Sequence, residues 1–578
     1  MAVTCLLSFL GLVVIVAGLG GLLARDAVRA RDALGQAAAG MVGLEAQLRE
    51  SPEAATADLA QVQASARSAV ASTSGPLWRL AAAVPVVGDN TDALAGLAQT
   101  LDRLATDVLP RMSQAAQVVT PENLAPVNGR LDLIPMLQVH DDVVAADAAV
   151  EAALARVSAI NRDPLIEELA TAADDLQTQL EQVSQTTHTA ARAVDLIPAM
   201  LGANGPREWV VLAQNNAEQR ATGGTPGIAL LMRAERGNVK IVDTLSTANV
   251  GRFDAPVLPL TSSEQGLWGN NLGTYLQDIT FTPDFPRTGR LAAQMWTQMR
   301  GDTPSGVLSV DPVALQGMLA ATGPVTFTDP FGDEVTLTAN NAAEFLMSGI
   351  YAAYDDNATQ DEVFGLAAQA AFTALLSGGA DARTVVDALV SAADQGRLMV
   401  WSADEGEQGR LAGTVLSGEL HGTVTSNAGE TSPVVGVHLN LTTGSKIGYF
   451  LDTSTRIENA ETLANGSQVF TVRVTLRNML EPGDGAKLPD YVIGDGPDDG
   501  TIRTNVYVYA PSFGEIENVT NAAGEPVVLA PSIHEGLQVG VREEVIEPGQ
   551  THETLYRIVS GRQQRGDIVL RVTPGARA

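Results

Sequence analysis

The sequence predicts a multidomain α+β protein with an N-terminal transmembrane helix, a helical bundle or coiled-coil stalk, a central α/β domain and a C-terminal β-sandwich. Three observations predict it. The chain has 578 residues, whereas a single hydrophobic core stops growing at roughly 250–300 residues. Residues 3–24 contain no charged side chain. The hydrophobic period then changes from three-and-four spacing to the alternation typical of strands. We expect domains at 1–25, 26–205, 206–410 and 411–578.

The charge balance limits the classes of partner. The chain has 36 basic and 67 acidic residues, a net charge of −31. Nucleic acids and anionic lipid surfaces attract basic proteins, so no nucleic-acid partner is expected. The single cysteine, Cys5, excludes an intramolecular disulfide and a cysteine-ligated metal cluster.

Residues 3–24 form an apolar run that is long enough to cross a bilayer, which needs about 20 residues, and longer than the apolar part of a signal peptide. We predict one uncleaved spanning helix that binds the chain to the cytoplasmic membrane. Arg25, Arg29 and Arg31 follow it, which by the positive-inside rule favours a cytoplasmic body. Large domains, however, translocate largely regardless of such charges. We therefore expect a single-pass cell-membrane protein with the bulk of the chain extracytoplasmic.

The stalk is predicted from helical periodicity over residues 32–200. One apolar seam holds Leu94, Leu97, Leu101, Leu104 and Val108; a second holds Leu169, Ala173, Leu176, Leu180, Val183, Thr187, Ala190 and Val194. Asp163-Pro164 has the N-cap and first-turn proline of a helix start. The seams need partner helices, and two arrangements stay open: antiparallel packing within one chain, or a homo-oligomeric coiled coil.

The central domain opens with an apolar strand, Trp209 to Leu212, which is expected to deliver polar residues into a loop ending at Gly223-Gly224. A second strand, Val307 to Val310, ends at Asp311 with Pro312 behind it. Polar groups just past strand ends are where α/β folds place ligand sites. For Asp311, a helix N-cap is the favoured interpretation.

Six residues are candidate ligand contacts: Asn215, Glu218, Arg220, Asp284, Arg287 and Asp311. Guanidinium groups suit phosphate, and the carboxylates of Glu218 and Asp284 are the hard oxygen ligands that Mg²⁺ prefers. Each of them also fits an ordinary surface charge or helix cap. The six histidines lie outside the central domain, which excludes a histidine general base there.

The rest of the chain adds helices over residues 340–396 and then strands. The segment Tyr351 to Asn357 is a polar break between those helices; a surface loop is the favoured interpretation, and a contribution to a cleft is the alternative. Beyond the Gly/Ser/Thr-rich residues 414–433, β-branched runs separated by turn residues predict a β-sandwich of immunoglobulin-like size. These runs are residues 438–442, 449–457, 469–476 and 506–509.

Four segments resemble the bacterial membrane-protein family called domain of unknown function 4012. They read Asn215-Asn-Ala-Glu-Gln-Arg-Ala-Thr-Gly-Gly224, Thr282-Pro-Asp-Phe-Pro286, Gly306-Val-Leu-Ser-Val-Asp-Pro312 and Leu319-Ala-Ala-Thr-Gly-Pro-Val325. The first string is fairly specific, and the resemblance extends to the whole predicted architecture, including the N-terminal span. The family carries no established activity.

The Val-Asp-Pro strand and the following helix are also distantly similar to LytR-CpsA-Psr proteins. Those are membrane-anchored enzymes that use arginines, acidic residues and magnesium to transfer glycopolymers from polyprenyl-pyrophosphate carriers. The resemblance implies Arg220 as the first pyrophosphate contact and Glu218 and Asp284 as metal ligands. Their Ser-Ile-Pro-Arg-Asp motif has no counterpart at residues 241–249, so a shared fold is implied more strongly than catalysis.

Two functional hypotheses follow. The first is a cell-envelope protein that binds a phosphate-bearing or polyprenyl-linked glycan in cell-wall or exopolysaccharide assembly, with turnover left open. The second is a non-catalytic scaffold that organises an envelope complex through its stalk. Convergence of Arg220, Glu218, Asp284 and a second arginine on a pocket would favour the first; dispersed, individually ion-paired charges and a surface without a cleft would favour the second.

Overall fold

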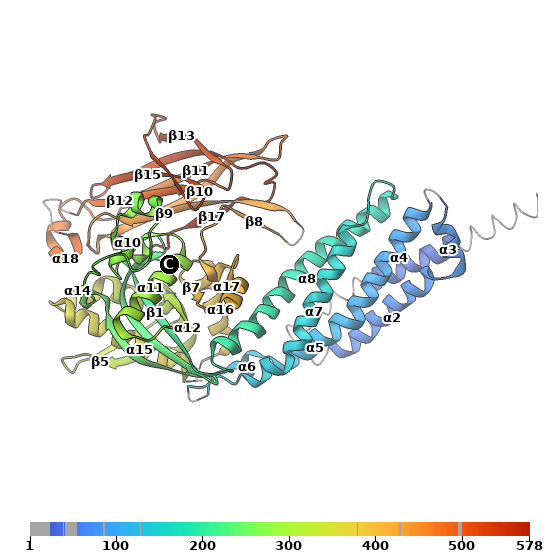
Figure 1. Cartoon of the computed structure of the whole chain (residues 1–578), viewed down its shortest axis with the longest axis horizontal. Helices are drawn as coiled ribbons and strands as arrows, with labels where there is room; N and C mark the ends of the chain where they lie inside the picture. Colours follow the sequence, from blue (N-terminus) through green and yellow to red (C-terminus); the bar gives the residue numbers. More distant parts are fainter. Residues whose placement is uncertain are drawn as a thin grey trace, which may run out of the picture. The chain divides into compact units, whose positions relative to one another are not determined.

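The computed structural model describes residues 23–37, 40, 55–84, 87–127, 129–377, 380–426, 429–494 and 500–577. It divides into two compact units (Figure 1). The helical unit comprises residues 1–123 and 133–197, and the mixed unit comprises residues 124–132 and 198–578. The predicted multidomain α+β class, with helices and several sheets, is confirmed.

The predicted transmembrane segment falls almost entirely on residues 1–22, which lie outside the described residues. Among the helices that the structure describes, none combines the length and apolar character needed to cross a membrane.

The helical unit contains a helix over residues 23–37 and a series of further helices. These are α2 (Ala55–Thr73), α3 (Pro76–Ala82), α4 (Val87–Arg103), the π-helix η1 (Leu104–Val108), α5 (Leu109–Val118), α6 (Pro121–Leu124), α7 (Ile134–Ser158) and α8 (Glu167–Met200). α6 and α8 each end just beyond the boundary of the helical unit. Asp163-Pro164 does not start α8, which begins at Glu167; residues 163–165 form a turn instead.

The two predicted seams pack against each other within one chain. Leu97 and Leu101 of α4 share a buried cluster with Leu176 and Leu180 of α8, and α7 completes it through Val150. Burying apolar seams between neighbouring helices is what stabilises short helices in water. Of the two arrangements left open, packing within the chain is therefore present in this structure.

The mixed unit is built on a five-stranded sheet with the order β3-β2-β1-β4-β7. The strands are β1 (Arg207–Arg220), β2 (Gly223–Glu235), β3 (Asn238–Ser246), β4 (Gly306–Val310) and β7 (Leu398–Ser402). β1 and β4 are parallel, and the other neighbours are antiparallel. Alternate side chains of β1 and β2 enter different cores, as the period of two in a strand requires.

Helices cover both faces of this sheet. Leu212 and Ala229 face a core containing Met295 and Trp296 of α11 (Phe285–Arg300). Ala213 and Ile228 face a second core, to which α12 (Pro312–Thr322), η4 (Phe345–Gly349), α14 (Ile350–Ala353) and α15 (Asn357–Leu376) contribute. The remaining elements of this region are η2 (Thr247–Asn249), α9 (Ser262–Trp268), α10 (Asn271–Thr274), η3 (Ile279–Phe281), β5 (Val325–Thr328), β6 (Glu334–Leu337), α13 (Ala342–Glu344), α16 (Ala382–Asp394), α17 (Glu405–Leu411) and η5 (Val415–Ser417).

Two further sheets form the C-terminal part of the mixed unit. One has the order β10-β11-β16-β13, and the other β14-β15-β12-β9-β17 with β8 paired to β9. They comprise β8 (Thr423–Thr425), β9 (Thr431–Leu441), β10 (Leu451–Thr462), β11 (Gln468–Asn478), β12 (Ile502–Tyr509), β13 (Glu515–Asn521), β14 (Ala530–His534), β15 (Leu537–Ile546), β16 (Thr551–Val559) and β17 (Val569–Val572). Val506 and Val508 enter the core shared by these two sheets. Tyr507 and Tyr509, on the other face of β12, join the α11 core.

One local expectation is wrong. Residues 214–220 do not leave β1 as a loop, because pairing with β2 continues to Arg220↔Gly223. The register shifts between Asn215 and Gln219, so three extra residues bulge from β1 while both strands continue. A bulge re-aims side chains without ending the strand.

Candidate functional site

The glycine pair closes the β1 bulge. A Cβ at Gly224 would lie 2.1 Å from the Asn215 carbonyl oxygen, so the backbones of β1 and β2 approach too closely for any other residue. The amide of Gly224 donates to Gln214 Oε1 at 2.8 Å. The φ angle of Gly223 is +131°, a conformation that favours glycine. The Gly223-Gly224 pair that ends the polar string from Asn215 is therefore explained by the close packing of β1 against β2.

The bulge forms one wall of a small cleft, which we call the polar cleft. Its volume is about 110 Å³. β1 and β2 contribute Asn215, Glu218, Thr225, Gly227 and Ile228; the remaining lining comes from Ala248, Gln277, Tyr351, Asn357, Gln360, Asp361, Phe364 and Lys446. Carboxylates, amides and an amine therefore line the cleft together with two aromatic rings, those of Tyr351 and Phe364.

Lys446 contributes a positive charge to the polar cleft. Its Nζ lies 2.7 Å from Glu218 Oε1 and 4.8 Å from the centroid of the Tyr351 ring. A cation over an aromatic face is held by the ring quadrupole. Both charged side chains are largely buried, at 16% and 17% exposure, so the pair is shielded from salt more than a surface pair would be.

Tyr351 and Asp361 complete the polar cleft. The Tyr351 hydroxyl accepts a hydrogen bond from Asn215 Nδ2, and burial, followed by the nearby Glu218 charge, raises the pKa of Tyr351 well above its usual value. Asp361 accepts a hydrogen bond from the Ser246 hydroxyl. Burial raises the pKa of Asp361, while Ser246 and Lys446 oppose that shift. Tyr351 is therefore a neutral hydrogen-bonding group at neutral pH.

Asp311 lies elsewhere, in a fully internal network. It is the N-cap of α12, accepting from the amide of Ala314 at 2.8 Å, as the favoured interpretation predicted. Its Oδ2 also accepts from Arg397 Nη1 at 2.7 Å and Asn216 Nδ2 at 2.9 Å. Arg397 in turn donates to the carbonyl oxygens of Gly575 and Arg577. This network ties the C-terminal segment to β1 and α12.

Arg220 is buried and does not line the polar cleft. Its guanidinium lies 4.7 Å from the centroid of the Phe281 ring, and Nη1 donates to the carbonyl oxygens of Gln219 and Leu441 at 3.1 and 3.3 Å. Within the described part of the chain, its Nε has no hydrogen-bond partner. Burial lowers the pKa of Arg220, and the charges of Glu218 and Asp278 oppose that shift. Arg220, the first candidate for a pyrophosphate contact, is therefore buried away from solvent.

Asp284 and Arg287 form a third, separate group. Asp284 is the N-cap of α11: one carboxylate oxygen accepts from the Arg287 amide at 3.0 Å and the other from the Leu420 amide at 3.1 Å. Burial raises the pKa of Asp284 to about 6. The Arg287 side chain forms a two-point ion pair with Glu264, at 2.6 and 3.1 Å.

Of the six candidates, the structure brings only Asn215 and Glu218 together in one cleft. Glu218 and Asp284 do not share a site, because Glu218 is paired with Lys446 while both oxygens of Asp284 accept backbone amides. These two carboxylates therefore do not fit a common Mg²⁺ ion.

Sequence reasoning missed Lys446 and Asp361 as members of the cleft. One signal was present for Lys446, since only Lys240, Lys446 and Lys487 are lysines. Tyr351 and Asn357 line the polar cleft, which is the alternative and not the favoured interpretation of their segment. A capping box was also missed: Thr261 and Glu264 start α9.

Residues 204–351 match the family described as "Protein of unknown function (DUF4012)". The predicted resemblance to this family is therefore confirmed, over a segment that holds β1, β4 and α12 together with Asn215, Glu218 and Tyr351 of the polar cleft. The match does not extend to the rest of the predicted architecture. Similarity to LytR-CpsA-Psr proteins is not shown. No curated protein and no solved structure matches the chain.

Proposed function

We propose that this chain is a cell-envelope protein that binds a glycan in the polar cleft without turning it over. The observation that carries the proposal is the composition of that cleft. Amide and carboxylate residues, Gln277, Asn357 and Asp361, line the cleft together with Tyr351. Such groups donate to and accept from hydroxyl groups, and ligand sites combine an apolar surface with a few convergent polar groups.

The charges support an uncharged glycan over its phosphate-bearing form. Two carboxylates, Glu218 and Asp361, face one ammonium group, Lys446, so a phosphate would enter a cleft that already holds excess negative charge. The arginines expected to bind phosphate are committed elsewhere: Arg287 to Glu264 and Arg220 to buried carbonyl oxygens. A polyprenyl-linked glycan fits this proposal only through its sugar units.

Binding without catalysis is supported by how the reactive groups are held. Glu218 is neutralised by Lys446 at 2.7 Å, and no histidine lines the polar cleft. A general acid and base must each be poised to exchange a proton with the substrate, whereas Glu218 is already engaged. We further propose that residues 3–24 anchor the chain in the cell membrane and that its bulk is extracytoplasmic.

The experiment compares matched neutral and phosphorylated sugars. Saturation-transfer NMR and calorimetry are run on the full chain with glucose, galactose, mannose and N-acetylglucosamine, each beside its 1-phosphate. We expect binding of a neutral sugar, weaker binding of its 1-phosphate, and at least tenfold weaker binding by Asp361→Asn, a loss of about 1.4 kcal/mol. Glu517→Gln is the control, because Glu517 pairs with Arg557 on the surface.

Three results would contradict the proposal. If none of the neutral sugars binds, the proposal of a glycan site is wrong. Tighter binding of the 1-phosphates than of the neutral sugars would favour a phosphate-bearing ligand over an uncharged one. Conversion of a disaccharide during the same NMR experiment would show turnover.

A second function, the scaffold, is favoured by an apolar groove in the helical unit. The groove has a volume of about 630 Å³ and is lined by the helix over residues 23–37, α4 and α8, with Trp78 at one wall. Val28, Val87 and Ile166 border it with exposed fractions of 49%, 47% and 58%. We propose that a second copy of this chain packs there, since exposed apolar surface of this extent marks an interaction site.

Light scattering tests the scaffold directly. The full chain is expected to be a dimer, and Ile166→Glu to be a monomer with unchanged helical content. Val390→Glu, at a residue 54% exposed on α16, is the matched control and should remain dimeric. A monomeric parent chain, or an Ile166→Glu dimer, would refute packing through the groove.

A further inference from the structure

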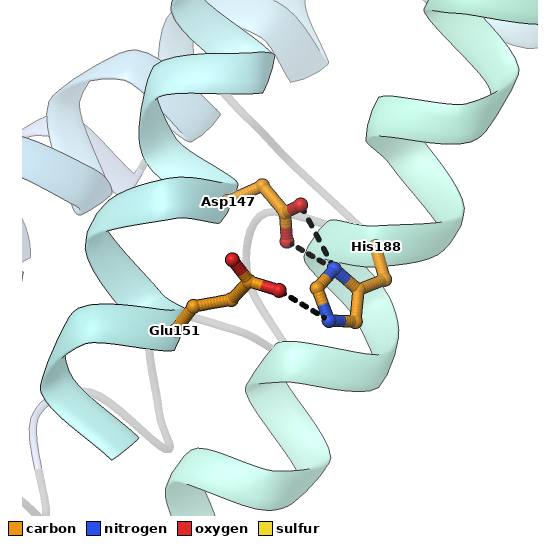
Figure 2. A group of neighbouring side chains, drawn as sticks. All are labelled: Asp147, Glu151 and His188. Atoms are coloured by element: carbon orange, nitrogen blue, oxygen red, sulfur yellow. Dashed lines mark hydrogen bonds and ion pairs between the residues drawn. The ribbon is translucent and has the colours of Figure 1, made fainter. Parts of the chain in front are cut away.

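A histidine between two carboxylates joins the long helices of the helical unit (Figure 2). Asp147 and Glu151 lie one turn apart on α7, and His188 projects between them from α8. Ligand atoms of the three side chains all lie within 4.8 Å of one another, and no other group of this kind occurs in the described part of the chain. Spacing of four residues places two side chains on the same face of a helix.

The orientation of the imidazole is fixed from one side. The Thr187 hydroxyl donates to Asp147 Oδ1 at 2.7 Å, and His188 Nδ1 lies 2.8 Å from the Asp147 carboxylate. Asp147 has only 16% of its side chain exposed. Nδ1 therefore keeps its proton for Asp147, and the other nitrogen, Nε2, points at Glu151 at 3.2 Å.

This arrangement matches the way proteins prepare a histidine as a metal ligand. A carboxylate commonly accepts the proton of one ring nitrogen, which fixes the tautomer and makes the other nitrogen a better ligand. Glu151 is 57% exposed, so its carboxylate is free to adjust toward an ion while Asp147 stays in place. Imidazole with carboxylate ligands suits Zn²⁺ and similar divalent transition metals.

We propose that His188 Nε2 and the Glu151 carboxylate bind a divalent transition-metal ion of the zinc class, with Asp147 as the positioning residue. The ion takes the place of the proton shared between Nε2 and Glu151, and that proton is released to solvent. Water completes the coordination shell on the exposed side. Because the two ligands come from α7 and α8, the ion links these helices. The inference does not rest on the proposed glycan site, which lies in the mixed unit.

The same two helices provide a matched control. His140 of α7 lies between Asp141 and Asp195, at 2.8 and 2.7 Å, so it is also a histidine contacting two carboxylates. Its neighbours do not converge as a group on one point in the manner of Asp147, Glu151 and His188. An ordinary histidine ion pair should behave like His140, whereas a metal site should not.

The full chain is treated with a chelator, dialysed, and titrated with Zn²⁺ by calorimetry and with Co²⁺ by visible absorption. We expect one ion per chain, with absorption bands from bound Co²⁺. His188→Ala and Glu151→Gln should abolish this binding, Asp147→Asn should weaken it by about 10–100-fold, and His140→Ala should leave it unchanged. Circular dichroism checks that each variant remains helical.

A second measurement is independent of whether a ligand variant folds. Zn²⁺ should raise the melting temperature of the helical unit in the parent chain and in His140→Ala, since an ion bound only by the folded state stabilises it. Absence of saturable binding by the parent chain would overturn the proposal and leave an ion pair between α7 and α8. Binding by His188→Ala equal to that of the parent would overturn it as well.

Discussion

Replacing Arg397 by methionine tests how the mixed unit is held together. Arg397 and Asp311 form an ion pair at 2.7 Å, with side chains only 6% and 3% exposed. Methionine fills much of the space of the arginine stem but provides no hydrogen-bond donor. The Asp311 carboxylate would keep its contacts to Asn216 and Ala314 and lose its ion pair with Arg397. The C-terminal segment would lose two hydrogen bonds from Arg397.

The expected cost follows from that burial. Breaking a buried pair leaves an uncompensated charge, which costs about 3–5 kcal/mol of unfolding free energy. Arg557→Met is the control: Arg557 pairs with Glu517 at side-chain exposures of 55% and 38%, and such surface pairs contribute about 0–1 kcal/mol. Asp311→Asn in the Arg397→Met chain should recover part of the loss, because a neutral amide is less costly to bury than an unpaired carboxylate.

The cost should also depend on pH. Burial raises the pKa of Asp311 in the folded state, and Arg397 opposes that shift, so removing Arg397 raises the pKa further. A carboxyl with a raised folded pKa stabilises the fold when it is protonated, and that contribution is lost as pH rises through the folded pKa. The difference between the variant and the parent should therefore be smaller at pH about 4 than at pH about 7.

Urea denaturation followed by tryptophan fluorescence measures these differences. The five tryptophans are Trp78, Trp209, Trp268, Trp296 and Trp401, and all but Trp78 lie in the mixed unit, so the signal reports chiefly on that unit. A loss for Arg397→Met no larger than that for Arg557→Met would refute the reasoning, because it would mean that water reaches Asp311.

Three further predictions concern single residues of the mixed unit. Burial lowers the pKa of His438 to about 4 from 6.5; the unfolded chain takes up this proton first, so about 3 kcal/mol of stability should be lost as pH falls through this range. His438→Gln should flatten that part of the stability–pH curve, and an unchanged curve would exclude His438 as its source. Gly306→Ala should cost about 1–3 kcal/mol in urea titrations, because its Cβ would lie 2.3 Å from both Trp209 Cζ3 and the Trp401 carbonyl oxygen. Gly317→Ala, with nothing within 4 Å in α12, should instead stabilise, and equal effects would contradict the packing argument. Phe513 has a φ of +58° and is 97% exposed; Phe513→Asn should raise stability by about 0.5–1 kcal/mol, measured as a shift in the denaturation midpoint, since asparagine tolerates this conformation better. A loss of stability would show that the Phe513 ring makes a contact worth more than the strain.

Local signals account for what the sequence predicted well. The caps of α11 and α12 were recognisable because Asp284 and Asp311 each precede a first-turn proline, and capping involves atoms only a few residues apart. The helical seams were readable because each repeats along one element.

Strand and loop were harder to separate at the end of β1. The polar residues Gln214 to Arg220 have the composition of a loop, yet pairing with β2 keeps them in a bulged strand. Tertiary context overrode propensity there, because the gain of cross-strand hydrogen bonds does not depend on the polarity of the side chains. Glycine at 223 and 224 was visible in the sequence, but the close approach of the two backbones that requires it was not.

The sequence by itself determined the mixed α+β class of the fold, the caps of α11 and α12, and the family of residues 204–351. The tertiary structure decided which polar residues meet. It placed Lys446 beside Glu218, 228 residues away in the chain, and Arg397 beside Asp311, while it buried Arg220 under Phe281. Periodicity and capping act within one element, so both can be recognised from residues that are close together in the sequence. Ion pairs and clefts depend on distances between elements, which only the packed cores fix.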